Sequence, residues 1–315
     1  MPARVIVAAV ALVSVLNSAA RTSSIGNPAS DANVERHHYS INARVRPLLF
    51  WIDCRDVGDA IVTVRRHGDG TGYSLLIGSD PQRTPQRINR WGYLDEDTHG
   101  TSATVIGLMT ESDERSLAQA KANVETSAAT QMFKLIRSSV TSDEARSLIT
   151  AMAVPSDYSF RQVRTVLDLA RRASVETKTQ VVRLPSGTRP GFLTAVADVV
   201  RTHVTQWQAS RRVDGGEPVR YIYRGRIYEL RAIGTRPVSN VQIGEATYAK
   251  VITSEFVIST RGNPVVSRFS MTYGAEGRYA AVPLSASFQP RWWLQIELTL
   301  DDTTQGRSTI AEVTR

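Results

Sequence analysis

The chain has 315 residues, a formal net charge of +8 and one cysteine, and 42% of its residues are hydrophobic. A charged fraction of 22% beside so many apolar residues excludes wholesale disorder, and the length allows one large domain or two ordinary ones. One cysteine excludes a disulfide framework and a cysteine-ligated zinc or iron–sulfur site within the chain. The longest mainly apolar stretch, Val5 to Leu16, has 12 residues, which is too few for a helix that crosses a bilayer.

Residues 1–20 have the three parts of a secretory signal peptide. Arg4 precedes the apolar stretch, and small residues follow it. Such an order predicts cleavage after Ala19 or Ala20 and a secreted or periplasmic protein. The alternative is a buried N-terminal helix. Residues 21–38 are polar and unpatterned, which predicts a flexible N-terminal tail.

The basic residues are dispersed along the chain in short doublets such as Arg65-Arg66, with no run of five or six. Nucleic-acid-binding proteins usually gather their basic residues into stripes or runs. We therefore expect no nucleic-acid partner. For an exported protein with this charge, a component of the cell envelope or an anionic polymer is the expected partner.

Residues 39–106 predict a β block. The β-branched, apolar runs Ala60–Val64 and Tyr73–Ile77 are joined by a segment with glycine at positions 68, 70 and 72. These glycines supply the positive φ angles that a hairpin loop needs. A phosphate-binding loop would lead from a strand into a helix, so the hairpin interpretation is favoured.

Residues 107–210 predict a helical segment, because apolar residues recur there at intervals of three and four. Patterns that resemble capping boxes begin at Thr110, Thr141 and Ser159, and each would open a helix. A further helix is expected from about Phe192 to Trp207, after a proline and a glycine.

Residues 218–302 predict a C-terminal β-meander, and residues 303–315 a tail. Alternation is clearest in the last strand, where Trp292 shares one face with Leu294 and the apolar residues beyond it. This pattern predicts that Trp292 is a core residue and that Trp293 lies on the opposite face.

The order of these elements predicts an α+β fold, an antiparallel β-meander with a helical middle segment. The two β blocks are either separate modules or parts of one half-barrel-like sheet. We favour the shared sheet, because the N-terminal block alone has few strands and would leave its edges unpaired.

Three short motifs in the β blocks combine aromatic residues with turn formers. They are Arg90-Trp91-Gly92-Tyr93, Gly277-Arg278-Tyr279-Ala280-Ala281-Val282-Pro283-Leu284 and Gln289-Pro290-Arg291-Trp292-Trp293-Leu294-Gln295-Ile296-Glu297-Leu298. In these motifs the chain resembles uncharacterised secreted bacterial proteins of unknown function, whose C-terminal open β-sheet ends in an aromatic strand. The resemblance implies such a sheet and no particular activity.

Familiar catalytic motifs are absent from the sequence. It contains no Gly-x-Ser-x-Gly elbow and no Ser-x-x-Lys pair. Cys54 lies in a mixed polar and apolar run, where an inert thiol is expected. These observations favour a protein that is not an enzyme and that has no cofactor.

The histidines and acidic residues show no established metal-binding spacing. No His-Glu-x-x-His or His-x-His occurs, so we expect no metal site. His203 lies on an apolar helical face, as a core histidine would. Asp95-Glu96-Asp97 with His99 fits a solvated acidic loop or a divalent-cation site, and the loop is favoured.

The candidate binding residues lie on the C-terminal meander and are Arg224, Arg226, Arg291 and Trp293. Arginine beside aromatic residues suits stacking on sugars or contact with anionic polymers. Ordinary cross-strand packing, or cover by the protein's own helices, is the alternative. We therefore predict an exported, non-catalytic β-sheet protein of the bacterial periplasm or cell envelope, which binds a partner, a lipid or an anionic polymer. The alternative function is a secreted hydrolase of an unrecognised class.

Overall fold

Fourteen strands and two helices make up the part of the chain that the structure describes. This computed structural model describes residues 33–46, 50–84, 87–110, 130–172, 177–260 and 263–302. Three expected segments lie outside these ranges: the signal peptide, most of the N-terminal tail and the C-terminal tail. Residues 111–129, which hold most of the helix expected after Thr110, also lie outside them.

The N-terminal half contributes strands and a short helical excursion. Its elements are β1 (Asn33–Val45), β2 (Ile52–His67), β3 (Gly70–Ser79), β4 (Trp91–His99), β5 (Ser102–Thr110), β6 (Thr130–Val140), β7 (Glu144–Pro155), η2 (Phe160–Gln162), α3 (Val163–Arg172) and β8 (Thr177–Arg183). The C-terminal half begins with the longer helix. Its elements are α4 (Phe192–Ser210), β9 (Val219–Tyr223), β10 (Arg226–Ile243), β11 (Ala246–Thr260), β12 (Asn263–Gly274), η3 (Gly277–Tyr279), β13 (Pro283–Arg291) and β14 (Leu294–Leu300).

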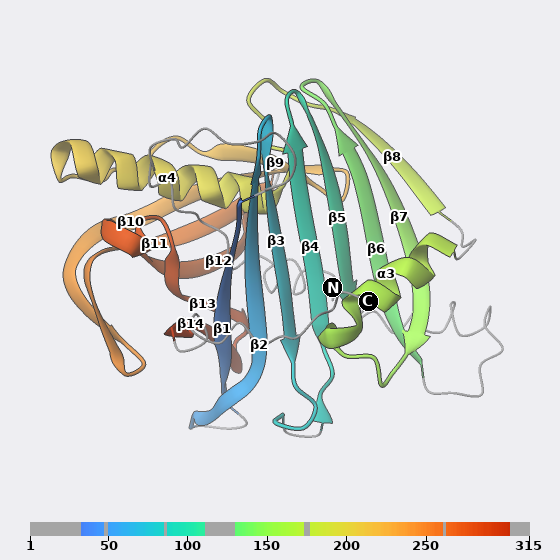
Figure 1. Ribbon diagram of the computed structural model, residues 1–315, viewed down its shortest axis with the longest axis horizontal. Helices are drawn as coiled ribbons and strands as arrows, with labels where there is room; N and C mark the ends of the chain where they lie inside the picture. The colour runs from blue at the N-terminus through green and yellow to red at the C-terminus, as the bar shows by residue number, and fades with distance from the viewer. Residues whose placement is uncertain are drawn as a thin grey trace, which may run out of the picture.

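All of these strands belong to one antiparallel sheet in the order β8-β7-β6-β5-β4-β3-β2-β1-β14-β13-β12-β11-β10-β9. The pairing of β1 with β14, from Tyr39 opposite Leu300 to Val45 opposite Leu294, joins the two β blocks. The predicted α+β meander with one shared sheet is therefore confirmed. The sheet is strongly curved and stays open (Figure 1). A single parallel bridge between Arg189 and Tyr221 links the segment after β8 to the opposite edge strand.

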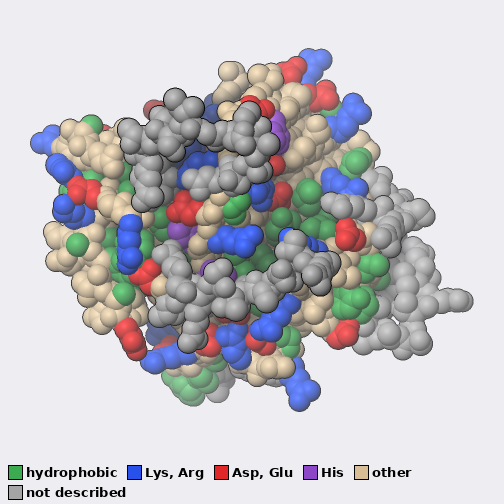
Figure 2. All heavy atoms as spheres, viewed as in Figure 1, with side chains coloured by type: hydrophobic (Ala, Val, Ile, Leu, Met, Phe, Trp, Pro, Cys, Tyr) green, Lys and Arg blue, Asp and Glu red, His purple; other side chains and the backbone are tan. Residues whose placement is uncertain are grey.

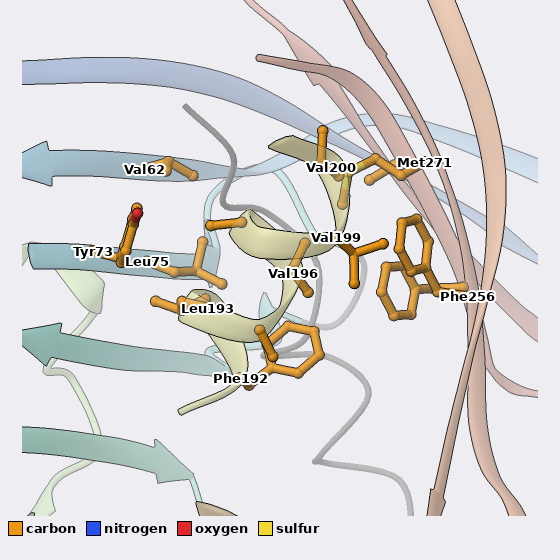
Figure 3. Close-up of a cluster of buried hydrophobic side chains, with 14 of the residues drawn as sticks. Val62, Tyr73, Leu75, Phe192, Leu193, Val196, Val199, Val200, Phe256 and Met271 are labelled. Atoms are coloured by element: carbon orange, nitrogen blue, oxygen red, sulfur yellow. The ribbon is translucent and has the colours of Figure 1, made fainter. Parts of the chain in front are cut away.

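Helix α4 lies inside the curved sheet, between its two halves (Figure 3). Val62, Tyr73 and Leu75 face the helix from β2 and β3, while Phe256 and Met271 face it from β11 and β12. The helix is buried over most of its length, because both of its sides meet apolar strand faces. The sequence correctly predicted this helix.

A smaller core covers the outer face of β4 to β7. Short helix α3 and the preceding η2 lie on that face, and Phe160 and Val166 pack there against Trp91, Phe133 and Leu135. The capping box predicted at Ser159 is present: its side chain accepts from the Arg161 amide, and the Gln162 side chain accepts from the Ser159 amide.

The predicted helical segment over residues 107–210 is wrong where β6 and β7 lie, because these are strands. The alternation of β-branched residues from Ser174 to Leu184 predicts an extended segment within it, and β8 lies there. Both faces of β6 are buried: Phe133 belongs to the outer core, while Ile136 and Val140 belong to the core around α4. Burial on two faces removes the polar–apolar alternation that marks a strand, so the spacing imitated a helix. At Thr141 the side chain accepts from the Glu144 amide in a strand-connecting turn, not at a helix start.

The predicted N-terminal tail also ends earlier than expected, because β1 begins at Asn33. His37 is buried in this strand and lies 3.1 Å from the Glu35 carboxylate. Residues 33–38 pair with β2, from Asn33 opposite Arg66 to His38 opposite Ile61. They are therefore part of the central strands of the sheet.

Candidate functional site

Four large apolar side chains are exposed at one end of the sheet, where β2 begins and where β13 turns into β14. We call them the apolar rim: Phe50 is 62% exposed, Ile52 45%, Trp292 67% and Trp293 39%. Strand β1 holds the two regions together, because Val45 pairs with Ile52 on one side and with Leu294 on the other. The Arg46 amide also donates to the Trp293 carbonyl at 2.8 Å.

The prediction that Trp292 is a core residue is wrong. Strand β13 continues to Arg291, which pairs with Leu294, so Trp292 and Trp293 form the turn between β13 and β14. The alternation rule holds only within the strand, where Leu298 and Leu300 are buried as expected. In a turn it no longer fixes which side chain faces the core, and both indoles are exposed.

Basic residues lie close in sequence to the members of the apolar rim. Arg44 lies 5.7 Å from the ring centroid of Trp51 and is paired with Asp53 at 2.8 Å. Arg55 and Arg291 are exposed. Elsewhere on the molecule, Lys and Arg are spread in small groups among acidic side chains, with no continuous basic field on the face that Figure 2 shows.

The structure brings only two of the four predicted binding residues together. Arg291 and Trp293 are close neighbours at the β13–β14 turn, on the border of the apolar rim. Arg224 and Arg226 flank the β9–β10 turn at the same end of the sheet, but β11 and β12 separate the two turns. Arg226 is exposed, whereas Arg224 is half-buried.

The tyrosines that were expected beside these arginines do not form an exposed stacking surface. Tyr221, Tyr223 and Tyr228 are all buried, and the rings of Tyr221 and Tyr228 stack at 5.4 Å. Tyr221 and Tyr228 thus pack against each other across paired strands. Sequence reasoning missed Phe50 and Ile52 because nothing local places the β1–β2 connection beside the last hairpin.

A buried carboxylate caps the N-terminus of α4. Glu96 is fully buried on β4, and its oxygens accept from the Leu193 and Thr194 amides and the Thr194 hydroxyl at 2.7–2.8 Å. Burial raises the pKa of Glu96 to about 7, although these hydrogen bonds oppose the shift. A side chain at Gly191 would place its Cβ 2.1 Å from the Glu96 carboxyl carbon, so glycine is required for this approach.

Asp95, Glu96 and Asp97 therefore do not form the expected solvated loop. They lie within β4, where alternation turns Glu96 toward α4 and its two neighbours toward the outer face. Asp95 is paired there with Arg65 at 2.7 Å, and His99 is exposed at the end of the strand.

His203 begins a buried chain of polar groups on the opposite side of the core. Its Nδ1 lies 2.5 Å from the Tyr273 hydroxyl, which lies 2.9 Å from the Ser254 hydroxyl. The exposed fraction of these three side chains is 1% or less. Burial lowers the pKa of His203 to about 4. His203 is thus a core residue, as its place on the helix predicted.

Comparison with known proteins gives little about function. No protein-family description and no curated protein matches this chain. Among solved structures, the chain is similar to the "Beta-barrel-like Protein of Domain of Unknown Function DUF1849 from Brucella abortus", with a TM-score of 0.40 and 6% identity over 86% of this chain and 98% of that one. A likeness at this level carries no argument about what either protein does. In the described part of the chain, no helix combines the length and the apolar character that a membrane span needs.

Proposed function

We propose that the protein is exported and that it acts without catalysis in the bacterial periplasm or cell envelope, where its apolar rim docks onto an anionic lipid surface. The observation that carries this proposal is the exposure of Trp292, Trp293, Phe50 and Ile52 at one end of the sheet. Scattered exposed apolar residues are ordinary, but four large ones in two regions that β1 holds together mark an interaction surface.

The chemistry of the apolar rim favours a lipid surface over a protein groove. Indole rings on a protruding turn partition to the boundary between lipid headgroups and acyl chains, where one side of the ring is apolar and the N–H finds a polar partner. Exposed Arg55 and Arg291 beside them would meet anionic headgroups, each contributing about 1 kcal/mol.

Export is supported by the signal-peptide pattern of residues 1–20. A non-catalytic role is supported by the burial of the Ser254, Tyr273 and His203 side chains, which are the nearest approach to a nucleophile beside a base that we find among the described residues. A secreted hydrolase would need such a chain at a surface that substrate can reach.

The test is co-sedimentation of the processed protein with vesicles. The protein is taken from an exported fraction, where mass spectrometry should place its N-terminus at Ala20 or Arg21. We expect binding to vesicles of phosphatidylglycerol and phosphatidylethanolamine and weaker binding to phosphatidylcholine. Trp292→Ala and Trp293→Ala should each weaken binding roughly 10- to 100-fold, because removing an aromatic side chain that lipid buries loses about 1.5–3 kcal/mol.

Leu148→Ala provides the matched control. Leu148 is 39% exposed, as Trp293 is, but it lies on β7, away from the apolar rim. This variant should bind as the wild type does. Equal binding of wild type and Trp292→Ala, or no binding to either kind of vesicle, would show that the apolar rim does not dock onto lipid. An intact Met1 in exported protein would contradict the processing step.

A further inference from the structure

Two histidines and two aspartates meet on the outer face of the sheet, at the end opposite the apolar rim. We call them the His–Asp cluster: His67 ends β2, Asp69 lies in the β2–β3 turn, and Asp97 and His99 lie at the end of β4. Strand β3 runs between β2 and β4, so the cluster spans two hairpins. The Gly100 amide donates to the Asp69 carbonyl at 3.0 Å and ties the two turns together.

Glycines on β3 make this meeting possible. Gly70 pairs with His67, and Gly72 pairs with Asp97. A side chain at either glycine would therefore stand between His67 and Asp97. A Cβ at Gly72 would lie 2.6 Å from the Asp97 carboxylate, and one at Gly70 would lie 2.7 Å from the His67 ring. The absence of these side chains lets His67 reach across β3. The glycine-rich hairpin thus clears a space as well as forming a turn.

The two imidazole rings are stacked with their nitrogen atoms in register. Their centroids are 4.3 Å apart and their planes differ by 6°. On one edge, the Nε2 atoms of His67 and His99 lie 2.8 and 3.4 Å from the two oxygens of Asp97. On the other edge, both Nδ1 atoms converge on one oxygen of Asp69, at 3.5 and 3.4 Å.

This arrangement assigns different tasks to the two carboxylates. An Nε2–H donated to Asp97 leaves the lone pair of each ring on Nδ1. Metal-binding histidines are commonly oriented in this way, by donating the other ring N–H to a carboxylate. The Nδ1 atom of His67 is buried and makes no hydrogen bond within the described structure. The two Nδ1 atoms and one carboxylate oxygen of Asp69 therefore surround a common point, with the lone pairs of the two nearly parallel rings running side by side.

The distances around that point suit a small divalent ion better than direct hydrogen bonds. A tetrahedral Zn²⁺ with ligands at 2.0–2.1 Å has neighbouring ligand atoms about 3.3–3.4 Å apart. The Asp69 oxygen lies 3.4 and 3.5 Å from the two nitrogens, which is long for a hydrogen bond. The candidate ligand atoms of His67, Asp69 and His99 all lie within 4.8 Å of one another.

We propose that the His–Asp cluster binds a divalent transition-metal ion, Zn²⁺ by its donor set, through the Nδ1 atoms of His67 and His99 and a carboxylate oxygen of Asp69. Asp97 holds both rings in position. The charges of the two aspartates balance that of the ion, and nearby Arg65 is already paired with Asp95. Because His99 and Asp69 are exposed, a water molecule completes the fourth position. The bound ion cross-links the β2–β3 and β4–β5 hairpins.

The experiment is calorimetric titration of the untagged, processed protein with Zn²⁺, alongside Co²⁺ absorption spectroscopy. We expect one ion per chain, visible absorption bands of tetrahedral Co²⁺, and a raised melting temperature with Zn²⁺. His67→Asn, His99→Asn and Asp69→Asn should each abolish the Co²⁺ bands and weaken Zn²⁺ binding at least 100-fold. Asp97→Asn should weaken Zn²⁺ binding 10–100-fold, because the two imidazole rings lose the carboxylate that orients them.

His38→Asn is the control, because His38 is partly exposed on β1 and stands outside the cluster. This variant should bind as the wild type does, and circular dichroism should show that every variant is folded. No Zn²⁺ binding by the wild type, binding that survives all three ligand substitutions, or a loss in His38→Asn as large as in His67→Asn would each overturn the proposal. The vesicle binding of the apolar rim should be unchanged in His67→Asn.

Discussion

The core around α4 holds charged and polar groups, whereas the apolar rim exposes large apolar side chains to solvent. In the core, the Glu96 carboxylate accepts hydrogen bonds from the start of α4, and the Nδ1 atom of His203 pairs with the Tyr273 hydroxyl. On the rim, Trp292 and Phe50 have most of their surface uncovered. The difference indicates whether the binding partner of a side chain lies within the chain or outside it. A buried polar group that is satisfied internally serves the fold, while an exposed apolar cluster points to something outside the chain.

The largest expected effect compares one aromatic side chain from each region. Phe256 is fully buried, stacks on Phe269 at 4.8 Å and faces α4. Phe256→Ala should lower the free energy of unfolding by about 3–5 kcal/mol, because it leaves a cavity in the core. Trp292→Ala should change it by less than about 0.5 kcal/mol. Chemical denaturation of both variants checks this contrast, which an equal loss of stability would break.

Glu96→Gln probes the helix cap and should alter both stability and its pH dependence. The pKa of Glu96 is raised by burial from 4.5 to about 7, so between these values the folded state binds the proton more tightly than the unfolded state does. The Glu96 contribution to stability is therefore greatest below pH 4.5 and falls, by about 3 kcal/mol in all, as the pH rises to 7.

In Glu96→Gln the free energy of unfolding should no longer fall between pH 4.5 and 7 through this group. It should also lose about 1–3 kcal/mol of stability at pH 7, because the amide places a donor against the amides of Leu193 and Thr194. Denaturation at several pH values between 4 and 8 is the measurement. A Glu96→Gln profile parallel to that of the wild type would show that Glu96 does not titrate in this range.

His203→Gln should have the smaller effect, and its pH dependence should have the opposite sign. Burial lowers the pKa of His203 from 6.5 to about 4, so the unfolded state takes up the proton first as the pH falls. The His203 contribution is present above pH 6.5 and is lost toward pH 4, by up to about 3 kcal/mol. In the wild type it opposes the Glu96 contribution over most of the same range.

Removing His203 should therefore leave a protein whose stability falls more steeply as the pH rises from 4.5 to 6.5. In Glu96→Gln the stability should instead rise with pH over this range. In the double variant neither group contributes, so its stability should change with pH only through other groups. The same denaturation series measures all three proteins. A His203→Gln profile that tilts in the direction of Glu96→Gln would contradict the opposite roles of the two groups.

The local pattern was sufficient to predict elements that are marked by turn formers, caps or a regular apolar spacing. The glycine hairpin between β2 and β3, the capping box at Ser159, helix α4 and the alternating part of β14 could all be predicted. Each of these depends on neighbours within a few residues. The shared sheet was also predictable, because two β blocks with unpaired edges favour each other.

The tertiary structure decided everything that depends on distant segments. Strand β6 looked helical because its two faces pack against different cores, which the spacing alone does not distinguish. Trp292 is exposed, and not in the core as predicted, because the chain turns there from β13 into β14. The apolar rim exists because β1 pairs with β14, and the His–Asp cluster exists because the register of three strands sets His67 beside Asp97, 30 positions away in the sequence. Sequence determines such local preferences, whereas strand register, which is a property of the whole sheet, determines which side chains meet.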